Sequence, residues 1–193
     1  FSLYAKESTV TRRSGVLAGL AGLVLLLATH GAAAQTATGP DTALAFFGFE
    51  PGTTIARLGR QLDSLRTGHL RCDRAKADAH VSECRAVISA PGLGGPVNLW
   101  LSAIDSVSGV LTLSADVAPD QLDRWRNALA GAYGEVDAHV QGTQWMMQWV
   151  RRGRMIRLTW RTDRGRRVAS VSLVDGHVLD AWGRSRARQR PGG

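Results

Sequence analysis

Apolar and polar residues alternate along several segments of this chain, and this alternation restricts its fold more than any other feature of the sequence. The clearest pair is 97–105 and 111–117, which alternate on either side of a turn at 106–109. Successive side chains of a strand point to opposite faces of a sheet, so the pattern predicts a hairpin of half-buried antiparallel strands. Two further strands are expected around Cys72 and Cys84.

Three more alternating segments follow in the C-terminal part of the chain. Their apolar series begin at Trp145, Ile156 and Ala169, and glycine-containing turns at 152–153 and 163–165 separate them. Turns of this composition join neighbouring antiparallel strands. The sequence therefore predicts antiparallel strands in both halves of the chain.

Two segments with helical periodicity precede the two runs of strands. The first follows a threonine N-cap at 53–54 and repeats leucines such as Leu58 and Leu62 on one face. The second begins at Pro119 and ends before Gly134. Helices that cover one face of an antiparallel sheet make an α+β domain. We expect such a fold, with two helices packed on one face in helix–strands–helix–strands order.

The N-terminal residues 1–34 have the three parts of a secretory signal peptide. Arg12 and Arg13 lie in a positive region, an apolar run covers 16–29, and the small residues 32–34 form a cleavage site. The apolar run is shorter than the ~20 residues that span a bilayer, so we expect cleavage rather than a membrane anchor. The arginine pair leaves both the general and the twin-arginine export routes open.

Cleavage would divide the chain into a leader, a domain and a tail. We expect a flexible leader at 35–42, a single α+β domain at 43–183 and a disordered basic tail at 184–193, which has no apolar periodicity. The domain is long enough to bury a hydrophobic core. The protein is expected in the periplasm or outside the cell, with no membrane span after cleavage.

The two cysteines, Cys72 and Cys84, have two possible roles. In an oxidising compartment they are expected to form a disulfide between neighbouring strands. The alternative is a zinc site, because His69 and His80 give the spacing H-x2-C followed by H-x3-C. Zinc would require thiolates that stay reduced after export, so the disulfide is the favoured reading.

Motifs for catalysis are not evident. The chain has no G-x-S-x-G motif, and its glycine-rich loop at 92–96 does not lead into a helix that could bind phosphate. We therefore expect no catalytic residue, no metal ligand and no cofactor, and hence a protein that is not an enzyme. An unrecognised hydrolase or zinc protein remains as an alternative.

Arginines are concentrated near the C-terminus. Residues 151–193 contain twelve arginines and three aspartates, whereas residues 35–150 contain nine basic and twelve acidic residues. Such an asymmetry is typical of a surface that binds an acidic or anionic partner. Eight of these arginines are the candidate binding residues: Arg151, Arg152, Arg154, Arg157, Arg161, Arg164, Arg166 and Arg167.

Strand periodicity places part of this cluster on one face of the sheet. Arg157 and Arg161 alternate with the apolar residues of their strand, and Ser170 and Ser172 occupy the matching face of the next strand. We predict an exported, non-catalytic binding module that engages a protein or envelope component through this Arg-rich face. An anionic lipid or polyanion is the alternative partner. Nucleic acid is not expected because of the export signal. The simplest interpretation of the Arg-rich face is that it only keeps the protein soluble.

Six tryptophans are numerous for a chain of this length. Four of them lie on the apolar series and are expected in the core, which leaves Trp100 and Trp182 without an assigned place. Trp100 points away from its neighbours Leu99 and Leu101, so it shares the polar face of its strand. The alternative to a core role for the tryptophans is a binding surface, because tryptophan, tyrosine and arginine are favoured at interface hot spots.

The segment 47–58 (FGFEPGTTIARL), followed by Cys72 and Cys84, resembles a group of exported bacterial α+β modules. This group includes the β-lactamase-inhibitory protein and the small lipoprotein of the outer-membrane β-barrel assembly machinery. The resemblance covers about forty residues and implies a binding module without catalysis. The chain departs from the group because Thr53 follows Gly52 without a methionine, and because it lacks a lipid-acceptor cysteine, so no binding residue is carried over.

Overall fold

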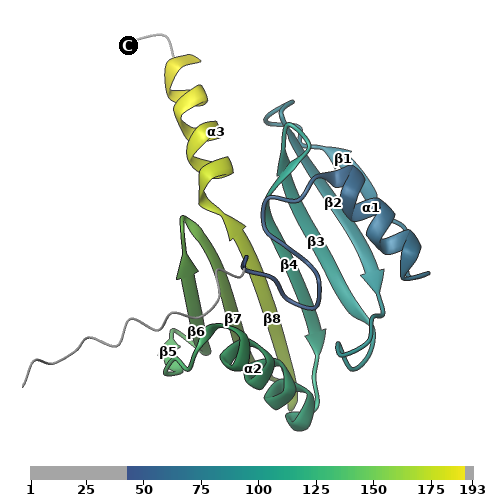
Figure 1. Ribbon diagram of the computed structural model, residues 1–193, viewed down its shortest axis with the longest axis vertical. Coiled ribbons are helices and arrows are strands. Elements are labelled where there is room, and N and C mark those ends of the chain that lie inside the picture. The colour runs from purple at the N-terminus through teal and green to yellow at the C-terminus, as the bar shows by residue number, and fades with distance from the viewer. Residues whose placement is uncertain (1–42, 190–193) are drawn as a thin grey trace, which may run out of the picture. The chain divides into compact units, whose positions relative to one another are not determined.

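The computed structural model describes residues 43–189. The predicted signal peptide and leader, and residues 190–193 of the predicted tail, lie outside the described residues. The described part contains one antiparallel sheet of eight strands and three helices (Figure 1), so it is a mixed α+β fold dominated by its sheet. The helices are α1 (Ile55–Ser64), α2 (Pro119–Tyr133) and α3 (Gly176–Gln189). The strands are β1 (Arg71–Arg74), β2 (Val81–Ile88), β3 (Val97–Ile104), β4 (Val107–Asp116), β5 (His139–Gln141), β6 (Gln144–Arg151), β7 (Arg154–Asp163) and β8 (Arg166–Asp175).

Two meanders of four strands make up the sheet. Its strand order is β1-β2-β3-β4-β8-β7-β6-β5, so each meander follows one helix and the two meet where β4 pairs with β8. At this junction Leu111 lies opposite Leu173, and Leu113 lies opposite Val171. All four side chains are buried, so the junction of the two meanders is also the centre of the core.

The core fills the space between one face of the sheet and the helices α1 and α2. Leu58 and Leu62 of α1, and Trp125 of α2, belong to the same buried cluster as the inward side chains of the strands. Phe46, from the segment before α1, packs edge-on against Trp125 with ring centroids 5.4 Å apart. The opposite sheet face bears neither of these helices; we call it the open face.

The ends of α1 and α2 agree with the sequence pattern. The Thr54 hydroxyl accepts a hydrogen bond from the amide of Arg57 and caps α1, and Pro119 occupies the first turn of α2. Gly134 ends α2 with a positive φ of 93°, a conformation that glycine adopts at little cost. The turns at Arg152-Gly153 and Arg164-Gly165 have positive φ at both central residues, as tight hairpins require.

The expected number and order of helices are wrong. A third helix, α3, follows β8, and its residues 184–189 belong to the segment predicted to be a disordered tail. The carboxylate of Asp175 caps this helix, because its Oδ1 accepts hydrogen bonds from the amides of His177 and Val178 at 3.0 and 3.2 Å. α3 leaves the sheet at the end of β8 and contacts β3, β4 and β7 (Figure 1).

The predicted turn at 106–109 is also displaced. The reversal occurs at Asp105 and Ser106, which have positive φ, and β4 already begins at Val107. Gly109 lies inside the strand beside a register shift, where the Leu179 side chain of α3 packs so close that a Cβ would meet it at 2.8 Å. This glycine therefore serves helix packing and not the turn.

Cys72 and Cys84 form the predicted disulfide. They are direct partners in the β1–β2 ladder, with Cα atoms 4.0 Å apart and sulfurs joined at 2.04 Å. The zinc alternative for these residues is excluded, because two sulfurs bonded to each other cannot act as thiolate ligands. The bond connects the edge strand β1 to the rest of the sheet.

We expect the double substitution Cys72→Ala and Cys84→Ala to lower the free energy of unfolding by about 3 kcal/mol, as for a disulfide that closes a short loop. Urea denaturation of both proteins, with and without reductant, measures this. The reductant should destabilise only the natural protein. Equal stabilities of the two oxidised proteins would contradict a stabilising role for the disulfide.

Candidate functional site

The open face carries rows of side chains that run across the strands. Ladder partners lie side by side on the same face, so the registers define each row. One row crosses seven of the eight strands, and we call it the central row. In the spatial order β1-β2-β3-β4-β8-β7-β6, its members are Arg71, Arg85, Trp100, Thr112, Ser172, Arg157 and Gln148.

Hydroxyl groups occupy the middle of the open face. Thr112 Oγ1 and Ser172 Oγ, from β4 and β8, lie 3.1 Å apart and share a hydrogen bond. The neighbouring row continues this pattern with Ser114, Ser170 and Thr159. These short, neutral side chains are half-buried, so the centre of the face is polar but free of charge.

Arg157 borders this hydroxyl-rich centre and is held in place. Its Nε and Nη2 both donate hydrogen bonds to the side-chain oxygen of Gln148, at 3.1 and 2.9 Å. The two residues are ladder partners on β7 and β6. A guanidinium fixed in this way loses less side-chain entropy when it binds a carboxylate.

Three of the eight candidate arginines lie on the open face. Arg157 and Arg161 were predicted to lie on the face of β7 that points away from Ile156, and the register confirms this placement. Arg166 of β8 lies on the same face. Arg166 is already paired, because its Nη1 lies 2.9 Å from Oδ2 of Asp116.

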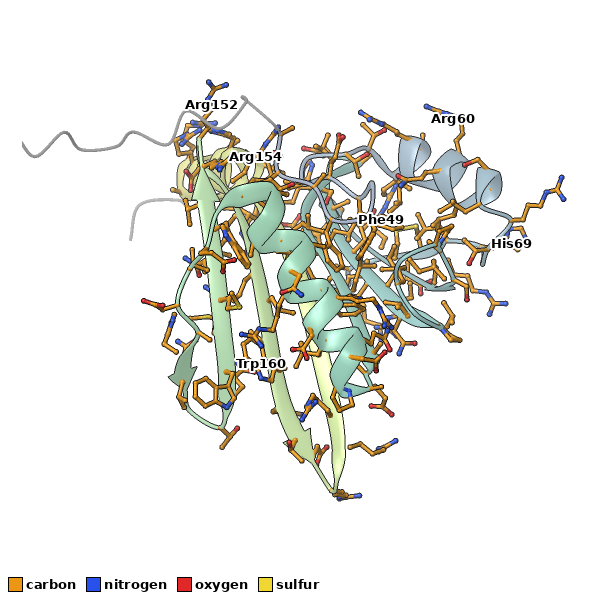
Figure 2. The ribbon with its side chains drawn as sticks, turned by 60° about the horizontal axis from the view of Figure 1, so that its bottom comes forward. Phe49, Arg60, His69, Arg152, Arg154 and Trp160 are labelled. Atoms are coloured by element: carbon orange, nitrogen blue, oxygen red, sulfur yellow. A yellow bond between two sulfur atoms is a disulfide. The ribbon has the colours of Figure 1, made fainter. Side chains whose placement is uncertain are left out.

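The other five candidate arginines lie elsewhere. Arg152 and Arg164 occupy turns, and Arg151, Arg154 and Arg167 alternate onto the face that packs against the helices. In Figure 2, Arg152 and Arg154 lie at the turn between β6 and β7, far along β7 from Trp160. The structure therefore does not bring the eight arginines together. The alternation of the strands predicts this division, because the cluster contains both odd and even positions.

Two of these arginines have structural partners on the helix side of the sheet. Arg151 donates from Nη2 to the carbonyl oxygen of Tyr133 at 3.0 Å and lies over the ring of that tyrosine. Arg154 Nε lies 2.9 Å from Oδ2 of Asp175, a carboxylate only 3% exposed that also caps α3. Both arginines therefore connect elements of the fold.

A second basic cluster, on β1 and β2, was not predicted from the sequence. Arg71 and Arg85 are direct ladder partners on the open face, and Arg85 lies opposite Trp100 on β3. A groove of 470 Å³ lies at this edge and includes His69 and Val87 among its lining residues. The signal in the sequence was the position of Trp100 on the polar face of its strand.

Only two of the four tryptophans expected in the core are fully buried. Trp125 and Trp149 are 0% and 4% exposed, whereas Trp145 is 46% exposed and stacks on the half-buried Trp160. The guanidinium of Arg126 covers the Trp160 ring, at 5.5 Å from its centroid. The expectation fails for Trp145 because strand alternation identifies a face but not how far a helix extends over it.

A separate polar cluster fixes α3 to the sheet. Asp78 Oδ2 accepts a hydrogen bond from the indole of Trp182 at 2.9 Å and lies 3.4 Å from Arg186. The backbone amide of His80, followed by this indole, holds the pKa of Asp78 below its ordinary value. A hydrogen bond from His80 to the carboxylate of Asp105, at 2.7 Å, raises the pKa of the imidazole. These contacts surround a cavity of 280 Å³ under α3.

Comparisons of the chain with protein-family models, with curated proteins and with solved structures find no match. The resemblance to exported inhibitor and assembly modules therefore stays a prediction. Among residues 43–189, no helix has the length and apolar content needed to cross a membrane.

We expect Asp175→Ala to lower the free energy of unfolding by about 2 kcal/mol, because α3 loses its cap and Arg154 its partner. Urea denaturation and hydrogen exchange of the α3 amides measure the effect. Asp180→Ala, an exposed change on the same helix, is the control and should have little effect. If the two variants are equally stable, Asp175 does not hold the helix.

We expect Asp105→Asn to lower the pKa of His80 toward its ordinary value of 6.5. Since the folded-state pKa is raised, the stabilisation is fully present below pH 6.5 and is lost as the pH rises through the folded pKa. NMR titration of the His80 ring in both proteins measures the shift. Asp73→Asn, on β1, is the control, and an unchanged His80 pKa in Asp105→Asn would refute the assignment.

Proposed function

We propose that this protein is an exported binding module that engages a protein partner through the open face of its sheet. The observation that carries the proposal is the composition of this face: a neutral, hydroxyl-rich centre bordered by Trp100 on one side and Arg157 on the other. Protein interfaces are depleted of charge at their centre and enriched in tryptophan, methionine and arginine. The half-buried Met155 also lies on this face, beside the central row.

The size of the open face supports a macromolecular partner. Eight strands at a spacing of about 4.8 Å span roughly 34 Å, and β4, β7 and β8, with ten residues each, are roughly 33 Å long. One partner of a standard protein complex contributes about 800 Å² to the interface. The face is larger than this, so it can hold such an interface without a change in the fold.

The balance of charge favours a protein over an anionic membrane or a polyanion. Basic and acidic side chains occur in similar numbers on the strands of this face. The arginines are Arg71, Arg85, Arg157, Arg161 and Arg166, and the carboxylates are Asp73, Glu83, Asp116 and Asp163. A polyanion attracts a surface with a large excess of positive charge, whereas a mixed pattern is suited to a partner with its own pattern of charges.

Photocrosslinking tests the proposal directly. A photoreactive residue replaces Thr112 or Ser170 at the centre of the open face in the full chain, expressed in the cells that make it. The control position is Arg60, an exposed residue of α1 on the other side of the sheet (Figure 2). We expect a discrete protein adduct from both central positions and not from Arg60.

We expect charge reversal by Arg157→Glu and Arg161→Glu to reduce the yield of this adduct at least five-fold, because like charges then face the partner. The matched control, Arg60→Glu with Arg66→Glu, makes the same change in net charge away from the open face. Quantitative mass spectrometry of the adduct measures both. Equal yields for the two double variants, or adducts from Arg60 alone, would refute the proposed face.

A further inference from the structure

We propose that the central row binds an extended acidic segment of the partner. One carboxylate of this segment contacts Arg71 and Arg85, a second contacts Arg157, and the chain between them crosses β3, β4 and β8. This inference rests on the proposed function, since it specifies the chemistry of the partner at the same face. Four observations on the structure lead to it.

The first observation is the arginine pair at one end of the row. Arg71 and Arg85 lie directly opposite each other on neighbouring strands, an arrangement that is unfavourable for two like charges. The only ion pair that either forms within residues 43–189 joins Arg85 to Glu83, at 3.8 Å and largely exposed to solvent. An exposed ion pair of this kind contributes little stabilisation. A bound carboxylate would therefore relieve the repulsion that remains between Arg71 and Arg85.

The second observation is the groove beside this pair. It has a volume of 470 Å³, and its lining combines guanidinium groups with the indole of Trp100 and the exposed side chain of Val87. Binding sites commonly pair apolar walls with a few charged groups that fix the ligand. The groove can therefore receive an acidic side chain together with the apolar part of a neighbouring residue.

The third observation is the orientation of Arg157 at the other end. Gln148 engages Nε and Nη2, so Nη1 forms no hydrogen bond within the described residues. A guanidinium has five N–H donors, and its planar fork suits a carboxylate. Gln148 thus fixes the side chain and leaves donors available for a ligand.

The fourth observation is the surface between the two ends. Thr112 and Ser172 are short and neutral, and their hydroxyls can exchange hydrogen bonds with a peptide backbone. Four strand spacings separate Arg85 from Arg157, which is about 19 Å. An extended chain advances about 3.3 Å per residue, so two carboxylates about six residues apart match the row.

Synthetic peptides test this spacing. The probe is an acetylated heptapeptide amide, Glu-Ser-Val-Ser-Val-Ser-Glu, titrated into the full chain up to 1 mM and followed by NMR shifts of the Trp100 indole. One comparison peptide has glutamine at both ends, and another has the same composition with the two glutamates adjacent. We expect the probe to bind at least ten-fold more tightly than either comparison peptide, because each comparison peptide loses at least one charge-assisted hydrogen-bonded contact.

Three variants test the contacts. Arg85→Gln and Arg157→Gln should each weaken binding of the probe roughly ten-fold, whereas Arg74→Gln, which alternates onto the other face of β1, should leave it unchanged. Circular dichroism of each variant checks that the fold is retained. Equal binding of the two glutamate peptides, no binding at 1 mM, or no effect of Arg85→Gln would each overturn the inference.

The two proposals can fail separately. If photocrosslinking identifies a partner at Thr112 while the probe does not bind, the open face is an interface but the acidic segment is wrong. If the probe binds with the expected spacing while no adduct forms at Thr112 or Ser170, the row recognises carboxylates but the proposed function is wrong. Each result therefore assigns the failure to one proposal.

Discussion

The pairing of β4 with β8 is the contact on which the rest of this structure depends. It joins two meanders of four strands into one sheet, although these strands lie about sixty residues apart in the chain. Leu111 against Leu173 and Leu113 against Val171 bury this junction on the helix side. The same register places Thr112 beside Ser172 on the open face. A shift of one residue would reverse both faces, so burial of the leucines fixes the polar rows of the other side.

The distribution of helices follows from that junction. Helices α1 and α2 each precede a meander and supply side chains to one continuous core on the same face. Their burial leaves the second face without a helical layer, apart from the contacts of α3 near the turn between β3 and β4. An antiparallel sheet tolerates a solvated face when that face is polar. The hydroxyls, arginines and Gln148 meet this requirement, and they do so without concentrating one sign of charge.

Local patterns in the sequence predicted the elements better than their assembly. The alternation at 97–105 and 145–149 identified strands, and the threonine cap and Pro119 identified two helices. Helix α3 was missed although its cap, Asp175, is adjacent in sequence, because the contact between Asp78 and Trp182 that holds the helix joins residues 104 positions apart. The central row was missed for a similar reason, since Arg85 and Arg157 share one row of the open face only through the β4–β8 register. The cluster of arginines in the sequence, in contrast, was divided by the alternation of the strands.

The arrangement of charges at the β1–β2 edge adds a constraint on orientation. Asp73 lies opposite Glu83, one row away from the pair Arg71 and Arg85. β1 and β2 thus each carry positive and negative charges, whereas each of these two rows carries charges of one sign only. A ligand that runs along the strands would meet alternating charges, and its own charges would have to alternate to match. A ligand that runs across the strands meets a single sign at this edge, so an acidic segment gains two favourable contacts from one row and is repelled by the next. This segregation of charge favours a segment that crosses the strands over one that lies parallel to them.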